Sequence, residues 1–500
     1  MYIELRTPDE RLRGPKAVDA APVLMQVLHA ARDGSVDLAR LRVVCDWIQY
    51  KQNFRDPLGL RFVEPWPLEA VRTSRNGSST DIADRAAWEI AIDLRRASDG
   101  SLDELLRTVL GGETEAIAHV PLEGWVPGSR SIIWGFNALY WKALSLWEQA
   151  TGRGYEQALP GGESDARNVA AARELIQQLF DVWDRLAARR ALPDELHVLE
   201  LGVGNGNQAK VWLDQFRLMD QEAGREYYRR LHYLMGDYSP HVLERARTSV
   251  SEHGDRVSSL VLDAMRPTET LGFLRYKAFL VYISNVYDNL PTDEIARIGG
   301  HLYQVQLRAG LPVPVASQIA SNLGVSPEDL PDLVSRLLRL GPALLSEALS
   351  DRFPTPSDAV AFWRALWEGL RLDERYIPLE ALDTYDVAPG VSGELLRPIA
   401  LSSGDVRMHV SNGAAASFTD TLPLLHPLGI LQCHDLFVTD IGQYATNFRG
   451  PGKYDGSVVN WVNGPMLAAI GSRRGFDVTF EAFAHRTGAN VLTMTARSRD

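Results

Sequence analysis

The stretch that decides the fold is Val198-Leu-Glu-Leu-Gly-Val-Gly-Asn-Gly-Asn207, in which an apolar run leads into three closely spaced glycines. The apolar run 196–201 predicts a short buried strand, and residues 208–216 predict a helix directly after the glycines. Glycines at such a junction let the chain turn sharply and let a ligand approach the backbone. The third glycine comes one residue too early for the dinucleotide-binding pattern G-x-G-x-x-G, which would place it at Asn207. Glu200, two positions before the first glycine, suits a ligand that carries an amine.

Strands and helices alternate after this motif, which predicts an α/β fold with a parallel sheet and helices on both of its faces. Apolar runs predict further strands at 231–235, 257–262, 278–284 and 430–438. Two final runs, 476–484 and 490–496, predict a closing antiparallel hairpin. In sheets of this kind ligands bind beyond the carboxyl ends of the strands, so the polar residues at those ends are the candidate site.

Each predicted strand is followed by polar side chains with a definable role. Asp237 can accept hydrogen bonds from both hydroxyls of a ribose, and Asp263 can accept one from an adenine amino group. Asn285, Tyr287 and Asp288 follow the fourth strand, where the reactive end of a ligand would lie. Asn285 could orient an amine, and Asp288 could act as a general base or pair with a cationic nitrogen.

Structural interpretations of the same residues stay open. Asp237 could cap the helix that follows it, and Asp263 could be a solvated loop residue. Asn285 and Asp288 could form a capped turn before a helix that the sequence predicts from Pro291. His434 ends the fifth strand and could titrate near neutral pH. No H-x-x-H or H-E-x-x-H pattern occurs, so no metal site is predicted.

The chain divides into four predicted regions. Residues 1–150 are predicted to be mainly helical, with segments near 20–32, 37–50, 81–98 and 131–149. Residues 151–309 form the first part of the α/β core. Residues 310–427 are predicted to be a mainly helical insertion that caps the sheet, and residues 428–500 supply the final strands.

Composition narrows the class of protein. The 500 residues carry 52 Lys and Arg against 64 Asp and Glu, a formal net charge of −12, which weighs against nucleic acid as a partner. No apolar run is long enough for a membrane span, and the charged first residues do not form a secretory signal. Only two cysteines occur, so we expect no disulfide framework and a cytoplasmic location. The sequence does not indicate an oligomeric state.

Together these residues resemble the class I S-adenosylmethionine-dependent methyltransferases. Glu200-x-Gly-x-Gly-x-Gly206 is similar to the first motif of that family, Asp237 to its ribose-binding acid, and Asp263-Ala264 to its adenine-contact pair. The resemblance covers about half of the chain and implies a Rossmann-like methyltransferase sheet with S-adenosylmethionine as cofactor. The implied cofactor-binding residues are Glu200, Gly202, Gly204, Gly206, Asn207, Asp237, Tyr238, Asp263, Ala264 and Asn285.

A narrower resemblance comes from Asn285-Val-Tyr-Asp-Asn-Leu-Pro291, which is similar to a segment of the MidA-like methyltransferases. That group includes the mitochondrial arginine methyltransferase that assists assembly of respiratory complex I. Gly154-Tyr155 and Gly161-Gly162, before the first strand, agree with it. Val286 stands where that group has Glu, and Asp237 where it usually has Glu. Arginine as the substrate is therefore a hypothesis.

The predicted function is methyl transfer from S-adenosylmethionine to an acceptor that the sequence does not identify, either a small molecule or a protein side chain. Asn285, Tyr287 and Asp288 are the predicted catalytic residues, which would orient and neutralise the acceptor. One alternative is a non-catalytic, methyltransferase-like assembly or binding protein that keeps the cofactor pocket. The other is an NAD(P)-dependent oxidoreductase, against which Asn207 counts.

Overall fold

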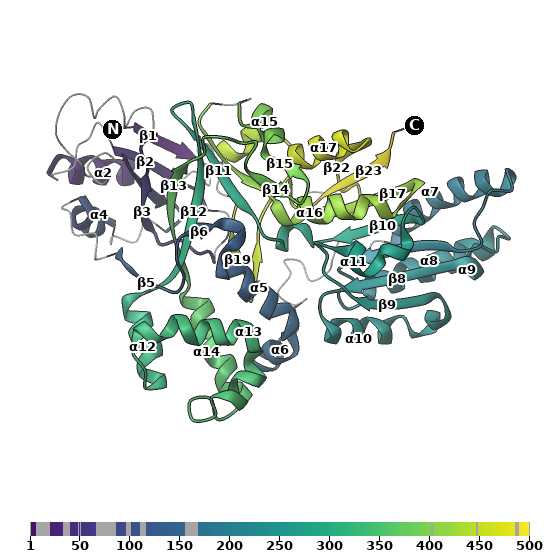
Figure 1. Cartoon of the computed structure of the whole chain (residues 1–500), viewed down its shortest axis with the longest axis horizontal. Coiled ribbons are helices and arrows are strands. Elements are labelled where there is room, and N and C mark those ends of the chain that lie inside the picture. Colours follow the sequence, from purple (N-terminus) through teal and green to yellow (C-terminus); the bar gives the residue numbers. More distant parts are fainter. Residues whose placement is uncertain are drawn as a thin grey trace.

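The structure is a computed structural model, shown in Figure 1. It describes residues 2–6, 21–33, 41–48, 50, 52–66, 87–96, 102–110, 117–155, 169–401, 404–446, 449–485 and 490–499. The described chain forms two lobes, each built on its own large sheet. Gly161-Gly162 lies outside the described residues. The structure confirms the α/β class.

The second lobe contains a seven-stranded sheet in the order β22-β23-β17-β10-β7-β8-β9. Its parallel strands are β7 (Leu196–Leu201), β8 (Leu231–Asp237), β9 (Val257–Val261), β10 (Ala278–Ser284) and β17 (Leu425–Asp435). The last two strands, β22 (Phe476–Ala482) and β23 (Leu492–Ser498), pair antiparallel with each other, and β23 pairs antiparallel with β17. The first strand along the chain, β7, therefore lies inside the sheet, and strand order reverses on either side of it.

Alternation along β7 explains how helices cover both faces of this sheet. Successive side chains of a strand point to opposite faces. Leu196 and Val198 pack with α7 (Val169–Ala188), α8 (Asn207–Glu222) and α10 (Pro240–Ser249). Leu199 and Leu201 pack on the other face, where the covering helices are α11 (Pro267–Leu271), α16 (Asn412–Thr421) and α17 (Gly464–Arg473).

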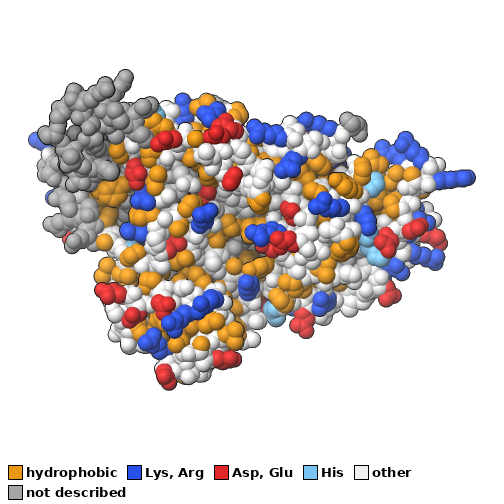
Figure 2. Space-filling view, viewed as in Figure 1, with side chains coloured by type: hydrophobic (Ala, Val, Ile, Leu, Met, Phe, Trp, Pro, Cys, Tyr) orange, Lys and Arg blue, Asp and Glu red, His pale blue; other side chains and the backbone are white. Residues whose placement is uncertain are grey.

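The first lobe contains a ten-stranded sheet. Its order is β1 (Tyr2–Arg6), β2 (Leu41–Asp46), β4 (Ala87–Asp93), β3 (Leu58–Val63), β13 (Arg371–Pro378), β12 (His301–Pro312), β11 (Asp293–Ile298) and β16 (Val406–Val410), with β5 (His119–Pro121) and β6 (Val126–Pro127) also pairing with β12. Strands from the start of the chain, from the end of the second predicted region and from the third thus share one sheet. Figure 2 shows that positive and negative side chains are interspersed over one face of the molecule.

The prediction that residues 1–150 are mainly helical is wrong for two of its four segments. The segment 37–50 contains β2, and the segment 81–98 contains β4, which pairs in parallel with β2. Leu41, Val43 and Cys45 are buried, as are Ile90 and Ile92, because both strands lie inside the sheet. Tertiary pairing overrides the helix-period apolar pattern here. The other two segments are helical, as α2 (Ala21–Asp33) and as α5 (Ile132–Lys142) with α6 (Leu144–Thr151).

The predicted helical insertion is only partly correct. Helices α12 (Val313–Leu323), α13 (Leu330–Ala348) and α14 (Pro356–Gly369) are present, and capping boxes at Ser326 and Thr355 begin two of the helical segments. These helices pack with α5 and α6 against β12 and β13 of the first lobe, so they do not cap the seven-stranded sheet. The helix predicted from Pro291 is instead strand β11, because residues 294–298 pair antiparallel with β12.

The remaining elements are short. They are α4 (Leu102–Leu110), α9 (Tyr227–Arg230), α15 (Arg397–Leu401), β14 (Asp386–Ala388), β15 (Val391–Ser392), β18 (Phe437–Val438), β19 (Gly452–Tyr454), β20 (Ser457–Val459) and β21 (Val462–Asn463). Among the helices that the structure describes, none combines the length and apolar character that crossing a bilayer requires.

Candidate functional site

The three glycines after β7 adopt a backbone conformation that glycine favours. Their φ angles are 75° at Gly202, 58° at Gly204 and 78° at Gly206, all in the left-handed region that other L-residues rarely enter. Gly202 N donates to Gly236 O over 2.8 Å, which fixes the loop against the end of β8. Asn205 Oδ1 accepts from the backbone N of Asn207 over 3.1 Å, at the first residue of α8. The loop is therefore a tight strand-to-helix turn.

Packing requires small residues in this loop as strongly as the dihedral angles do. A Cβ at Gly206 would lie 2.7 Å from Ala246 Cα and 2.9 Å from Ala246 O, in α10. A Cβ at Gly204 would lie 2.9 Å from the hydroxyl of Tyr155, and one at Gly202 would collide with the Val286 side chain. The glycines thus bring the first loop against α10 and against the loop that follows β10.

Asp237 connects the tips of β7 and β8. Its Oδ2 accepts from Gly204 N over 3.2 Å, and its Oδ1 accepts from Ser239 N over 2.9 Å. Burial raises the pKa of the Asp237 carboxyl to about 6, although these backbone bonds oppose the shift. A carboxylate oxygen has more than one lone pair, so each oxygen can accept a further bond from a ligand hydroxyl. The side chain of Ser239, and not that of Asp237, accepts from the first turn of α10.

Two further predicted cofactor residues lie at neighbouring strand ends. Asp263 follows β9, and its Oδ1 accepts from Met265 N over 2.9 Å in a local turn that leaves the residue and Ala264 partly exposed. Tyr238 follows β8 and is 36% exposed. Its ring lies 4.9 Å from Lys142 Nζ at the end of α5, a cation–π contact from the first lobe.

The loop after β10 combines one exposed and two buried candidates. Asn285 is exposed, has a φ of 52°, and donates from its backbone N to His434 O over 2.9 Å. Tyr287 and Asp288 are 1% and 6% exposed. The structure therefore brings the Asn285 side chain to the strand tips and turns the side chains of the other two inward.

Asp435, at the end of β17, holds this loop in place. One of its oxygens, Oδ2, accepts from Tyr287 N over 2.8 Å and from Asp288 N over 3.3 Å, and Oδ1 accepts from Leu436 N over 2.7 Å. Burial raises the pKa of Asp435 to about 6. Burial, together with the charge of Asp435, raises the pKa of Asp288 well above its ordinary value. A raised pKa disfavours the ionised form, so this surrounding makes Asp288 less ready to ionise than an exposed aspartate.

Glu200 has a different surrounding from the one that the sequence suggests. Its carboxyl is 2% exposed and accepts from the hydroxyl of Tyr233 over 2.5 Å. Burial raises the pKa of Glu200 to about 8. The geometry gives this carboxyl a partner on β8 within the sheet, and contact with a ligand amine stays a prediction.

His434 lies at the end of β17 but is 5% exposed. Its Nδ1 lies 2.9 Å from Thr493 Oγ1 of β23. The ring therefore belongs to the sheet face near the closing hairpin, beside an open groove of about 480 Å³.

Tyr155 is a site residue that motif analysis of the strand ends misses. Its hydroxyl accepts from Asn205 N over 3.2 Å, and its backbone N donates to Glu148 Oε1 over 3.0 Å. Its ring also contacts Trp141 of α5 edge-on. Glu148 in turn forms an ion pair with Arg245 of α10 at 3.0 Å. Only the Gly154-Tyr155 element of the narrower resemblance points to this position.

Comparison with known proteins gives structural likenesses alone. No family model matches the chain, and no curated protein matches it. The solved structure of a likely methyl transferase from Burkholderia thailandensis, bound to S-adenosyl-homocysteine, is 14% identical in sequence. The match covers 79% of this chain and 92% of that chain, with a TM-score of 0.43. DszA carbon methyltransferase is 11% identical over 66% of this chain and 54% of its own, with a TM-score of 0.31. The glycopeptide N-methyltransferase MtfA is 12% identical over 66% of this chain and 90% of its own, with a TM-score of 0.27.

Proposed function

We propose that this chain is a class I S-adenosylmethionine-dependent methyltransferase with the cofactor across the tips of β7, β8, β9 and β10. The observation that carries the proposal is the junction of the glycine loop with Asp237, where Gly204 N donates to a half-buried carboxylate at the carboxyl end of β8, beside the tip of β7. Strand order reverses on either side of β7, and open α/β sheets bind ligands at such a point.

The residues at these tips fit the cofactor by their chemistry. Asp237 offers free acceptor capacity for two ribose hydroxyls, and Asp263 and Ala264 lie at the next strand end for an adenine ring. The dihedral angles and packing of the glycine loop exclude larger residues, which keeps side chains of its own from these strand tips. When bound, S-adenosylmethionine supplies an electrophilic methyl group.

The acceptor would lie between the tip of β10 and α5 of the first lobe. Asn285 is an exposed polar side chain on that tip, and the contact of Lys142 with Tyr238 joins α5 to the neighbouring tip of β8. We assign orientation of the acceptor to Asn285. We assign Tyr287 and Asp288 a positioning role, since both side chains are buried and their backbone amides are held by Asp435. Alignment of two reactants can supply much of the rate of such a transfer.

The acceptor class stays open between a small molecule and a protein side chain, and arginine stays a hypothesis. A cytoplasmic location is supported by Cys45 and Cys433, which are both buried and unpaired. A non-catalytic binding protein would keep the same pocket. An NAD(P)-dependent oxidoreductase is disfavoured by the glycine spacing, which places Asn207 where the third glycine of the dinucleotide-binding pattern would fall.

The test is calorimetric titration of the whole chain with S-adenosylmethionine and, separately, with NADH. We expect binding of S-adenosylmethionine that is lost in Asp237→Ala, and no binding of NADH. Asp263→Ala, at a strand end further from the loop, should weaken binding less. Equal binding by wild type and Asp237→Ala would contradict the proposed position of the cofactor, and binding of NADH alone would support the oxidoreductase. Binding without methyl transfer to any acceptor tested would support the non-catalytic alternative.

A further inference from the structure

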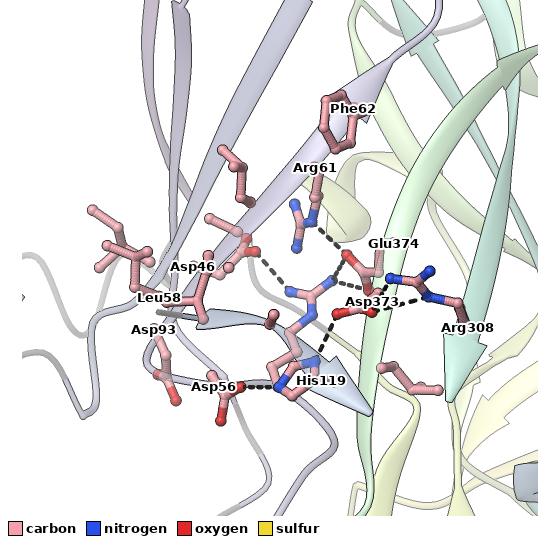
Figure 3. A pocket seen from close by; sticks show the side chains of 18 of the residues that line it. Asp46, Asp56, Leu58, Arg61, Phe62, Asp93, His119, Arg308, Asp373 and Glu374 are labelled. Carbon is pink, nitrogen blue, oxygen red and sulfur yellow. Dashed lines mark hydrogen bonds and ion pairs between the residues drawn. The ribbon is translucent and has the colours of Figure 1, made fainter. Parts of the chain in front are cut away.

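A cavity of about 250 Å³ lies in the first lobe, away from the strand tips of the second. It opens between the β3–β4 ribbon and the strands β5, β12 and β13, and its lining carries charges of both signs (Figure 3). Buried apolar side chains, among them Leu58, Ile92 and Leu372, line it as well. A site of this kind, with an apolar wall and a few convergent polar groups, is typical of small-molecule binding.

Two adjacent small residues contribute to the room in this cavity. Gly59 of β3 lies directly opposite Ala91 of β4, and both line the cavity. A Cβ built on Gly59 would meet no atom within 4 Å. A larger side chain at Gly59 would therefore extend into open space without displacing its neighbours.

The positive groups of the lining are already neutralised. His119 holds Asp56 at 2.8 Å through Nε2 and Asp373 at 2.7 Å through Nδ1, as Figure 3 shows. Arg308 donates to Asp373 over 2.9 Å. Arg55 donates to Asp46 Oδ2 over 2.9 Å. Arg61, a further cation of the lining, pairs with Glu89 over 2.5 Å. Among the described lining residues, each cation is thus already held by a carboxylate.

Asp46 differs from the other acids of the lining. It is 2% exposed, and its Oδ1 has no hydrogen-bond partner among the residues that the structure describes. Asp93 lines the same cavity, but both of its oxygens are used, by Arg95 N at 3.0 Å and by Arg96 Nε at 2.6 Å. An acceptor that is buried and unpaired carries a desolvation cost that a donor from a ligand would offset.

We propose that this cavity binds a small organic cation, a primary amine or guanidine with a short apolar body, whose N–H groups donate to Asp46 Oδ1. A charged donor is favoured because a hydrogen bond between ionised groups is stronger than one between neutral groups. The apolar body would lie against Leu372 and against Ala91, which shares a strand face with Asp46 and Gly59. This site is separate from the proposed cofactor site and does not depend on methyl transfer.

The test is calorimetric titration of the full chain with three probes of one shape, butylamine, butanol and butyrate. We expect one butylamine to bind per chain, with butanol and butyrate at least tenfold weaker. Gly59→Leu should abolish butylamine binding by filling the cavity, without altering a charge. Asp46→Asn should weaken butylamine at least tenfold, and the matched exchange Asp93→Asn, in a fully paired acid of the same lining, should leave it unchanged.

Thermal unfolding of each variant checks that it folds. If Asp46→Asn does not fold, Gly59→Leu still tests the proposal. S-adenosylmethionine affinity should be the same in Gly59→Leu as in wild type, which distinguishes this site from the proposed cofactor site. Butyrate or butanol binding as tightly as butylamine would overturn the proposal. So would butylamine binding that survives Gly59→Leu, or the absence of any butylamine binding.

Discussion

Replacement of Gly206 by alanine tests whether the glycine loop is built against α10 as the structure describes. Gly206 has a φ of 78°, and its Cβ would lie 2.7 Å from Ala246 Cα and 2.9 Å from Ala246 O. The matched control is Gly224→Ala. Gly224 has a φ of 64°, also left-handed, but a Cβ there would meet nothing within 4 Å.

The two variants separate dihedral strain from collision. Each carries the cost of placing alanine in the left-handed region, roughly 1–2 kcal/mol. Gly206→Ala adds the cost of overpacking against a helix backbone, roughly 1–3 kcal/mol. We therefore expect Gly206→Ala to be destabilised by about 2–5 kcal/mol and Gly224→Ala by about 1–2 kcal/mol.

Chemical denaturation of both variants beside wild type measures these differences. Gly206→Ala should also lose affinity for S-adenosylmethionine, because relief of the collision moves the loop, whereas Gly224→Ala should keep it. Equal destabilisation by the two substitutions would refute the packing of the loop on α10. Unchanged S-adenosylmethionine affinity in a clearly destabilised Gly206→Ala would refute the link between loop shape and cofactor binding.

Three further predictions concern titratable groups. Wild-type affinity for S-adenosylmethionine should fall as pH drops through about 6, because the Asp237 carboxyl, with its pKa raised to about 6, must be ionised to accept both ribose hydroxyls. Calorimetric titration from pH 5 to 8 measures this fall. Asp237→Asn should bind the cofactor weakly at every pH. Burial lowers the pKa of His119, but its bonds to Asp373 and Asp56 outweigh burial and raise that pKa from 6.5 to about 9. Protonated His119 should therefore stabilise the folded state by up to ~3 kcal/mol below pH 6.5, and this contribution should be lost as the pH rises through about 9. His119→Gln should lack that slope in denaturation curves, and a slope that persists would contradict the assignment. Asp435→Asn should cost about 2–4 kcal/mol, since three backbone N–H groups lose an ionised acceptor; a neutral effect on unfolding would show that the loop does not depend on it.

The core strands could be predicted from local sequence. β7, β8 and β10 are mainly apolar segments that are buried along most of their length, and each ends at a polar or glycine-containing turn. The glycine turn and Asp237 are separated by α8, the short helix α9 and strand β8. Their meeting at the sheet edge follows from parallel topology alone, which is why this part of the site could be found.

The first lobe could not be predicted in the same way, because its pairings are long-range. β3 pairs in parallel with β13, through Phe62 opposite Arg375, and no local signal joins strands so far apart in the chain. β2 carries the buried run Val43-Val44-Cys45 together with Arg42, whose charge is paired with Glu89 of β4 at 3.2 Å. An ion pair inside a sheet hides the period-2 pattern by which strands are recognised.

The catalytic assignments depended on contacts of the same long-range kind. The position of Asp288 directly after a strand predicts an accessible general base. Its pKa is raised by burial and by the charge of Asp435, which lies 147 residues later in the chain and accepts from the Asp288 amide. Tyr155 reaches the glycine loop from a position 50 residues before Asn205. In both cases the deciding neighbour lies on another element, where periodicity and spacing carry no information.

The most direct test of the central claim is hydrogen–deuterium exchange of the whole chain with and without S-adenosylmethionine. Bound ligand at the strand tips should protect the backbone amides of 202–207, 237–239, 263–265 and 285–288. The amides around Asp46 and Gly59 in the first lobe should exchange at unchanged rates. Protection confined to the first lobe, or none in the glycine loop at saturating S-adenosylmethionine, would contradict the account.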